Sequence, residues 1–250
     1  MQGIGNDFVV VDTRKQKISF SVQQIKALAN RHLGIGFDQL IIIGEPKDTS
    51  CDASYRFFNP DGSKAQQCGN GQRCIALYLH KLKPQNFKFK VSGLAGVICS
   101  EILKDNRVSV SMGKLNSIES RIINTRKCCY VDLGNPHLVI EVDDVASCDL
   151  ADLYQQINPC FQQGVNLEIV QILSDKQIKI RVHERGTGET LACGSGACAA
   201  VIALNHQSKI NHKATVLLPG GELMVEYQQS NNNIKLTGPA RYIFTGEISL

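Results

Sequence analysis

The chain has 250 residues, of which 43% are hydrophobic and 20% charged, a composition typical of a folded globular protein with one or two domains. The formal net charge of +4 is spread along the chain, and no run of Lys or Arg indicates nucleic-acid binding. The first residues do not resemble a signal peptide, and no apolar run is long enough for a membrane helix. We therefore expect a cytoplasmic protein that binds neither nucleic acid nor a membrane.

Short strands and a few helices are predicted in alternation along the chain. β-Branched segments predict strands at residues 9–11, 40–43, 108–110, 138–142, 178–182 and 216–218. Apolar residues at helical spacing predict helices at residues 23–33, 73–81 and 197–205. This mixture favours an α+β architecture.

The ten cysteines raise the possibility of disulfides or of a zinc site. A chain of this length without an export signal is expected to keep its thiols reduced. Structural zinc sites favour cysteine pairs spaced roughly two to four residues apart, and the sequence has no Cys-x-x-Cys. We therefore predict no metal site and interpret most of the cysteines as core residues.

The sequence also repeats itself weakly, in four short matches that keep the same order. Residues 5–12 resemble 134–140, residues 36–41 resemble 164–169, residues 68–71 match 193–196, and residues 108–113 resemble 235–238. The cysteines of the third match, Cys68 and Cys193, lie 125 residues apart (193 − 68). Each match alone is weak, but four in one order predict two homologous lobes joined near residues 113–118.

The third match carries the chemistry. Cys68 and Cys193 each precede a predicted helix, which starts at about Gln72 or Ala197, and each has a Gly-x-Gly run beside it. A helix N-terminus stabilises anions and lowers a cysteine pKa, and glycines let backbone N–H groups approach a carboxylate. Two such ends across one cleft would place a sulfur on each side of the adjacent carbon. Inversion of a stereocentre needs two such acid–base groups, so the pattern predicts a racemase or epimerase that needs no cofactor.

The less specific interpretation is that each Cys-Gly-x-Gly is only a turn before a helix. One copy would favour that interpretation, but two copies occupy matched positions in the repeat. Each cysteine also follows a polar residue by nine positions, Asn59 in the first lobe and Glu184 in the second. Cys74 and Cys198 lie inside the predicted helices, and we interpret them as core residues.

At these residues the sequence resembles the diaminopimelate epimerase family. The matching motifs are residues 3–8, 34–39, 59–63, 67–71, 134–137, 184–190, 192–196 and 219–221. The resemblance implies two pseudo-symmetric lobes, each a β-sheet or barrel wrapped around a central helix. The first lobe would span residues 1–113 and be completed by a C-terminal strand at 239–250, and the second would span 114–238. It also implies a homodimer that interconverts LL- and meso-diaminopimelate, for lysine and peptidoglycan synthesis, without pyridoxal phosphate or metal.

The resemblance assigns roles to residues at the matching positions. Cys68 and Cys193 would be the acid–base pair, and His137 and Glu184 would set the protonation of the two sulfurs. The backbone at the reacting carboxylate would come from Gly69, Asn70, Gly194 and Ser195. The distant end of the substrate would be bound by Asn59, Asn135, Asn166 and Arg185, with Asn6 and Gln39 completing the pocket. Alternatively, Asn59 and Asn135 are turn residues, and Glu184 and Arg185 form a surface ion pair.

Three other functions compete with this one. A two-cysteine racemase of proline or hydroxyproline would not need Arg185 and three asparagines for a second charged end of its substrate. An isomerase with a carboxylate base would not need both cysteines. A non-catalytic protein that closes on an amino acid would leave both cysteines incidental, and it would not exchange the α-proton of its ligand.

Overall fold

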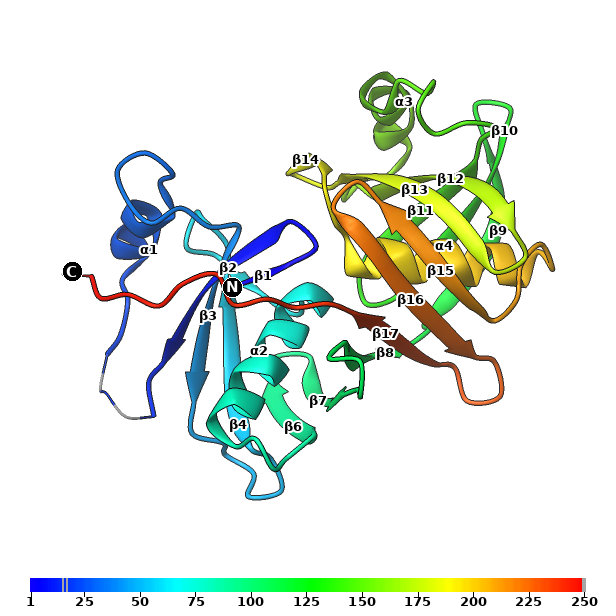
Figure 1. Cartoon of the computed structure of the whole chain (residues 1–250). Coiled ribbons are helices and arrows are strands. Elements are labelled where there is room, and N and C mark those ends of the chain that lie inside the picture. The colour runs from blue at the N-terminus through cyan, green and yellow to red at the C-terminus, as the bar shows by residue number, and fades with distance from the viewer. Residues whose placement is uncertain (15, 17, 249–250) are drawn as a thin grey trace. The chain divides into compact units, whose positions relative to one another are not determined.

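The computed structural model describes residues 1–14, 16 and 18–248, and the chain in it separates into two compact units. Unit 1 contains Met1–Val110 and the chain from Gly238 on, and unit 2 contains Ser111–Thr237. Figure 1 shows that each unit combines many strands with a few helices. This confirms the α+β class. Within the described residues, no helix has the length and apolar character needed to cross a membrane.

Unit 1 has a sheet that packs against helix α2 (Gly69–Leu82). Its strands are β1 (Gln2–Gly3), β2 (Asn6–Asp12), β3 (Gln39–Gly44), β4 (Ala53–Phe58), β5 (Lys64–Ala65), β6 (Lys88–Gly93), β7 (Gly96–Ile102) and the first part of β8 (Val108–Lys114). β2–β3 and β4–β6 pair in parallel, and the other pairs of neighbouring strands are antiparallel. α2 contacts β1, β2, β6 and β7, and α1 (Val22–Ala29) supplies Ile25 and Leu28 to a second core cluster.

Unit 2 wraps its strands around helix α4 (Gly194–His206), as Figure 1 shows. Its strands are β9 (Ser117–Ile123), β10 (Arg126–Asp132), β11 (Pro136–Glu141), β12 (Asn166–Ser174), β13 (Gln177–Glu184), β14 (Gly188–Thr190), β15 (Lys213–Leu218), β16 (Gly221–Gln228) and β17 (Asn233–Gly238). α4 contacts β10–β13, β15 and β16, and all its residues from Gly196 to Leu204 are buried. A helix that is apolar on every side needs such a complete enclosure. Helix α3 (Leu150–Ile157) and the 3₁₀ helix η1 (Asn158–Cys160) precede β12.

The two units repeat the same strand pairings, which supports the pseudo-symmetric fold. The parallel pair β2–β3 corresponds to β11–β12, and the parallel pair β4–β6 corresponds to β13–β15. The register corresponds as well, because Phe8 pairs with Gln39 in unit 1 and His137 pairs with Asn166 in unit 2. Gln39 thus corresponds to Asn166, and the sequence match of residues 36–41 with 164–169, which aligns Gln39 with Leu167, is wrong by one residue. This correspondence allows the two units to be compared residue by residue.

The helices that follow the two cysteines begin three residues earlier than predicted. α2 begins at Gly69 and α4 at Gly194, and the extended N-cap residues are Cys68 and Cys193 themselves. The prediction was wrong because glycine has a low helix propensity. That low propensity matters little in a first turn, where the backbone N–H groups have no partner within the helix.

The other helix boundaries follow local hydrogen bonds that the apolar pattern does not reveal. α1 ends at Ala29, earlier than predicted, because the side chain of Asn30 accepts from the N–H groups of His32 and Leu33. α3 lies outside the predicted helices, and its start is marked by Asp149, whose side chain accepts from the N–H of Asp152.

The C-terminal strand expected at residues 239–250 is wrong for residues 239–248, and residues 249–250 lie outside the part of the chain that the structure describes. In this part of the described chain the only strand pairing is an isolated bridge between Gln2 and Arg241, with two hydrogen bonds of 2.9 Å. Pro239 has no N–H to donate to a ladder. Ile243 and Phe244 are exposed, so this segment has no apolar face that packing would hold in an extended conformation.

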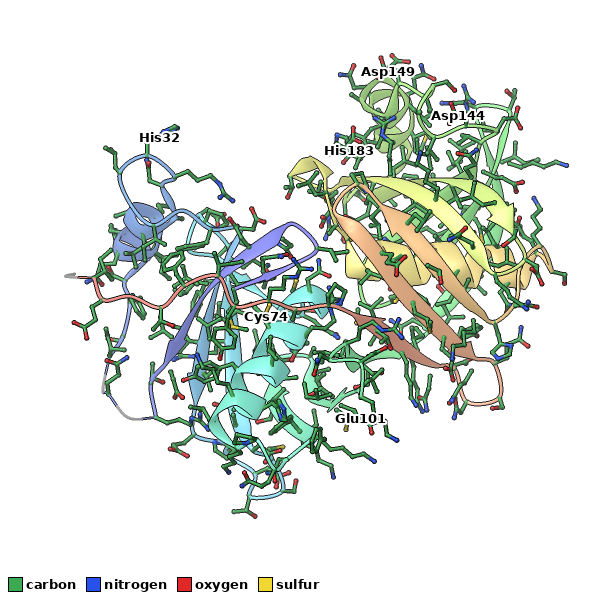
Figure 2. All side chains as sticks on the ribbon, viewed as in Figure 1. His32, Cys74, Glu101, Asp144, Asp149 and His183 are labelled. Carbon is green, nitrogen blue, oxygen red and sulfur yellow. The ribbon has the colours of Figure 1, made fainter. Side chains whose placement is uncertain are left out.

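The interpretation of Cys74 and Cys198 as core residues is confirmed. Both side chains are fully buried, on α2 and α4 respectively, and Figure 2 labels Cys74 on its helix. Burial raises the pKa of Cys74 to about 12, so this thiol stays protonated at neutral pH. Cys128 and Cys129 of β10 are also buried, and the Cys128 thiol donates to the carbonyl of Arg121.

Candidate active site

The first turn of α2 and its neighbours form what we call the Cys68 half-site: Cys68, Asn6, Asn70 and the backbone of Gly69. Cys68 is half-buried, and its sulfur lies 3.5 Å from Oδ1 of Asn6. The side chain of Asn70 donates to the same oxygen at 3.3 Å. The amide oxygen of Asn6 is therefore a hydrogen-bond acceptor for the thiol form of Cys68.

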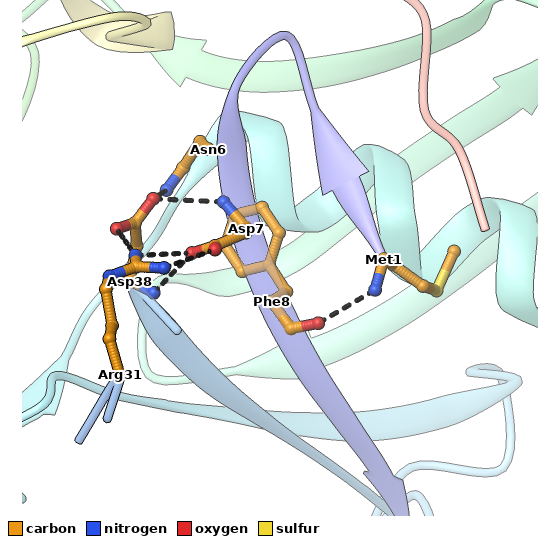
Figure 3. Close-up of polar contacts among 6 residues, drawn as sticks. All are labelled: Met1, Asn6, Asp7, Phe8, Arg31 and Asp38. Carbon is orange, nitrogen blue, oxygen red and sulfur yellow. Dashed lines mark hydrogen bonds and ion pairs between the residues drawn. The ribbon is translucent and has the colours of Figure 1, made fainter. Parts of the chain in front are cut away.

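Asp38 fixes the orientation of the Asn6 amide, as Figure 3 shows. Nδ2 of Asn6 donates to Oδ2 of Asp38 at 2.8 Å, so Oδ1 must face the sulfur. Asp38 also accepts from the backbone N–H of Asp7 and from Arg31, which binds both oxygens of Asp7 as well. Burial alone would raise the pKa of Asp7, but hydrogen bonds from Arg31 and from the backbone of Asp38 lower it.

The remaining predicted residues of unit 1 are Gln39 and Asn59, which bond to each other. Nε2 of Gln39 donates to Oδ1 of Asn59 at 3.0 Å, and Nδ2 of Asn59 donates to the hydroxyl of Ser63 at 3.1 Å. Asn59 also closes a turn through its backbone, because its N–H donates to the carbonyl of Ser63. The backbone of Asn59 thus lies in a turn, and its side chain contacts Gln39 and Ser63.

The Cys193 half-site, at the first turn of α4, consists of Cys193, Ser195, Gly196 and Glu184. Cys193 is 6% exposed, and its sulfur accepts the N–H of Gly196 at 3.3 Å, as an N-cap side chain does. The hydroxyl of Ser195 lies 3.5 Å from the sulfur. Glu184 lies near enough for its charge to raise the pKa of Cys193, and it accepts from the hydroxyl of Thr190 at 2.6 Å.

The surroundings of Cys193 raise its pKa, which contradicts the expectation that a helix N-terminus lowers it. Burial is the largest cause, followed by the charges of Glu184 and Glu168, and together they outweigh the hydrogen bonds from Ser195 and Gly196. Burial also raises the pKa of Glu184. The Cys193 half-site therefore favours a protonated sulfur.

His137 makes its close polar contact with Glu168, a residue that the sequence analysis did not select. Nδ1 of His137 and Oε1 of Glu168 are 2.7 Å apart, and both side chains are fully buried. A signal for Glu168 was present, because it is a charged residue within the apolar run of β12. A charged residue in such a run is seldom buried unless it is paired.

Three other predicted residues lie in unit 2, near the end of β13 and the start of α4. The backbone N–H of Arg185 donates to Oδ1 of Asn166 at 2.9 Å, and the side chain of Asn166 donates to the carbonyl of Pro136. The exposed guanidinium of Arg185 donates to the carbonyl of Gln163, and no ion pair with Glu184 is found among the described residues. Nδ2 of Asn135 donates to the hydroxyl of Ser195 at 3.4 Å.

The structure thus brings some predicted residues to each helix N-terminus, Asn6 and Asn70 to Cys68 and Ser195 to Cys193. Gln39 with Asn59 and Asn166 with Arg185 form separate hydrogen-bonded pairs, and unit 2 also has a buried His–Glu pair. Among the described residues, no group of three or more His, Cys, Asp or Glu side chains is arranged to hold a metal ion. Two cysteines with different surroundings, backbone N–H donors beside each and one exposed guanidinium are suited to acid–base chemistry on a carboxylate substrate.

Comparison with solved structures shows that the fold is shared with several proteins. A phenazine biosynthesis protein of the PhzF family from Enterococcus faecalis gives a TM-score of 0.72 at 16% identity, over 98% of this chain and 94% of that one. A hydroxyproline epimerase from Agrobacterium vitis, with bound trans-4-OH-L-proline, gives 0.69 at 12%, over 95% and 86%. A methylitaconate-delta-isomerase gives 0.68 at 12%, over 98% and 92%. At these identities the likeness concerns the fold alone.

Comparison with family models gives a more specific result. The model described as diaminopimelate epimerase matches residues 1–118 and 129–243, which include both cysteine-capped helices. The chain therefore belongs to the diaminopimelate epimerase family of isomerases.

Proposed function

We propose that the protein interconverts LL- and meso-diaminopimelate by proton transfer between the substrate and two cysteines, with no cofactor. The observation that carries this proposal is the repeated N-cap cysteine, Cys68 on α2 and Cys193 on α4, in a chain of the diaminopimelate epimerase family. A two-base inversion needs one proton acceptor and one donor, and the two half-sites offer sulfurs in different surroundings.

The proposed reaction moves one proton off the α-carbon and one onto it. Cys68, as a thiolate, takes the α-proton and becomes a thiol, and the electron pair left on the carbon is delocalised into the adjacent carboxylate. Cys193, as a thiol, gives its proton to the opposite face and becomes a thiolate. One C–H bond breaks and one forms, so the step needs no oxidant or leaving group. The first-turn N–H groups of Gly69, Asn70, Gly194 and Ser195 would stabilise the carboxylate.

The preference for a substrate with two amino-acid ends rests on Arg185 and the amide side chains. The guanidinium of Arg185 is exposed and can bind a carboxylate through two parallel hydrogen bonds. Asn166 holds the backbone of that residue, and Asn59 and Asn135 would add amide donors and acceptors for the distant end. Proline and hydroxyproline have no second charged end for Arg185 to bind.

The decisive experiment is incubation of the pure protein with LL-diaminopimelate and a metal chelator, without pyridoxal phosphate, followed by chiral analysis. We expect a mixture of LL- and meso-forms, and incorporation of deuterium at the α-carbon in D₂O. Faster turnover of proline or hydroxyproline, or loss of activity in chelator, would contradict the proposed substrate or mechanism. From the family we also propose a cytoplasmic homodimer, which size-exclusion chromatography with light scattering tests.

The proposed mechanism also requires both sulfurs to approach one carbon, and oxidation tests this requirement. We expect mild oxidation without substrate to join Cys68 to Cys193 and abolish activity, thiol reductant to restore it, and substrate to protect. A disulfide needs α-carbons within about 7 Å, and the two residues lie 125 apart in sequence, so chance pairing is improbable. Peptide mapping that repeatedly finds other pairs, with both Cys→Ala variants still active, would exclude the two-cysteine mechanism.

A further inference from the structure

The pair His137–Glu168 is polar and lies buried in unit 2. The two residues lie on the neighbouring strands β11 and β12, both fully buried, with their bonded atoms 2.7 Å apart. Removing a carboxylate and an imidazole from water costs free energy that the hydrogen bond between them often fails to offset, and apolar residues of similar size are frequently as stable. A buried pair of this kind therefore calls for a reason other than packing.

Unit 1 shows that the same scaffold accepts an apolar pair at this place. Phe8 in β2 has the register position that His137 has in β11. Phe8 pairs with Gln39 and His137 pairs with Asn166, so Gln39 and Asn166 correspond. Two residues further along their strands lie Ile41 and Glu168, which therefore also correspond. Phe8 and Ile41 are as well buried as the polar pair. Unit 2 therefore has a histidine and a carboxylate where the repeat has a phenylalanine and an isoleucine.

The pair also lies against the helix turn that carries the sulfur. Gly71 and Gly196 are the third residues of α2 and α4. A Cβ on Gly71 would lie 2.5 Å from the ring of Phe57 and 3.2 Å from that of Phe8. A Cβ on Gly196 would lie 2.7 Å from Oε1 of Glu168 and 3.3 Å from the sulfur of Cys193. Where unit 1 has aromatic carbon beside this glycine, unit 2 thus has a carboxylate oxygen, and the sulfur of Cys193 lies beside the same glycine.

Two chemical consequences follow from this placement. A carboxylate only accepts hydrogen bonds, so Nδ1 of His137 carries a proton, and in the neutral form of the ring Nε2 is then an acceptor. Within the described residues, neither Nε2 of His137 nor Oε2 of Glu168 has a hydrogen-bond partner. The negative charge of Glu168, together with that of Glu184, opposes ionisation of Cys193, whose pKa is raised by burial and by these two charges.

We propose that Glu168 is a positioning residue of the Cys193 half-site: it holds His137 in a single tautomer and keeps the nearby sulfur in its thiol form. This inference rests on the proposed function, since it makes Cys193 the proton donor, while Cys68 becomes the base once its thiol, which donates to Asn6, has lost its proton. The repeat keeps the two cysteines in matching places, and Glu168 makes them different.

The first test replaces the carboxylate with an amide of the same shape, Glu168→Gln. Nδ1 of His137 keeps an acceptor in this variant, and the negative charge is removed. We expect Cys193 to react with iodoacetamide at pH 8 about tenfold faster than in wild type, as peptide mass spectrometry measures, because the thiolate fraction rises. kcat should fall about 10- to 100-fold with a shifted pH profile and a nearly unchanged KM. The control is Glu141→Gln, an exposed position on β11 that pairs with Lys209.

A second variant copies unit 1, His137→Phe with Glu168→Ile. If the pair serves only packing, this double variant keeps its activity, and that result would overturn the proposal. We expect a urea midpoint equal to or above that of wild type, together with loss of epimerisation. A wild-type Cys193 alkylation profile in Glu168→Gln also overturns the proposal, whatever the substrate. If wild type fails to epimerise diaminopimelate but the alkylation shift is present, the proposed substrate is wrong and the role of Glu168 stands.

Discussion

The two cysteine-capped helices begin with the same backbone conformation, an extended N-cap cysteine, but the side chains around the two sulfurs differ. Cys68 is half-buried and contacts the amide oxygen of Asn6, and a carboxylate, Asp38, binds only the far side of that amide. Cys193 is buried, accepts its own helix N–H, and lies among the carboxylates Glu184 and Glu168. A repeat can therefore supply two equivalent positions, and the neighbouring side chains can set each one to a different task.

The largest expected effect comes from removing either sulfur. Cys68→Ala and Cys193→Ala should each lower kcat by at least about 10²–10⁴-fold, because each removes one of two proton carriers while the other half-site stays intact. Chiral analysis of product from LL- and meso-diaminopimelate measures this loss. Cys74→Ala and Cys198→Ala are controls within the same helices, six (74 − 68) and five (198 − 193) residues further along, and they should cost stability and not kcat.

The two single variants also sharpen the comparison. With Cys193 as the resting donor, Cys193→Ala keeps the base of Cys68 and should retain some α-proton exchange with solvent from one stereoisomer. Cys68→Ala should lose that exchange. Equal exchange in both variants would mean that the two half-sites are equivalent despite their different neighbours.

Much of this difference could not be predicted from the sequence. The α+β class and the paired cysteines follow from local patterns: β-branched runs, a repeat and two Cys-Gly-x-Gly motifs. Asp38 lies inside a recognised motif, but its bond to Asn6 depends on the parallel pairing of β2 with β3. The contact of Glu168 with His137 likewise depends on the parallel pairing of β11 with β12. Strand register decides such partners, and short patterns do not contain it.

Local chemistry also misled the prediction in particular places. The starts of α2 and α4 were predicted too late, because each helix begins with glycine, which has a low helix propensity. The expected low pKa of Cys193 failed because burial and two carboxylates outweigh the helix N-terminus. The strand expected from the family is absent at residues 239–248, where the described chain has one isolated bridge. Pro239 cannot donate a backbone hydrogen bond, and the apolar side chains of this segment are exposed. Roles of individual site residues in binding remain predictions.

The next largest effect concerns Arg185, which also has no counterpart in unit 1. Asn59, which follows β4, and Glu184, the last residue of β13, occupy matching positions, so the residue that corresponds to Arg185 is Pro60. Arg185→Ala should raise KM and lower kcat/KM by about 10²-fold, because the distant carboxylate loses a charged partner. Part of the loss should be in kcat, since remote binding aligns the reacting carbon.

Steady-state kinetics with diaminopimelate measures the effect of Arg185→Ala. Arg181→Ala on the same strand is the control for charge, because Arg181 forms its ion pair with Glu189. A variant at position 185 with wild-type kinetics would show that this guanidinium does not bind substrate.

A smaller effect is expected at Asp38, whose position in unit 2 holds the buried Val165. Asp38→Ala should lower kcat/KM several-fold, roughly 3- to 10-fold, because the Asn6 amide loses the bond that directs its oxygen toward Cys68. Arg31→Ala is the matched control, since it breaks the exposed ion pairs and keeps the Asp38–Asn6 bond. If both variants lose the same activity, the ion pairs and not the amide orientation are responsible.

The smallest effect is on stability, and it has opposite pH dependence in the two units. Burial raises the folded-state pKa of Glu184 above its ordinary value of 4.5. Its stabilising contribution is therefore complete below about pH 4.5 and is lost as the pH rises through the higher folded value. Asp7 in unit 1 has a lowered pKa, so its contribution is present above 3.8 and is lost as the pH falls.

Replacing Glu184 with an amide should therefore stabilise the chain at neutral pH. Glu184→Gln keeps an acceptor for Thr190 and removes the buried charge, so we expect about 1 kcal/mol more free energy of unfolding at pH 7 and little difference near pH 4.5. Urea titrations at the two pH values measure this difference, with the exposed Glu222→Gln as the control. Activity should fall in the same variant, because Cys193 loses one of the charges that hold it protonated. A uniform loss of stability at both pH values would show that Glu184 is a structural residue of β13 and not part of the Cys193 half-site.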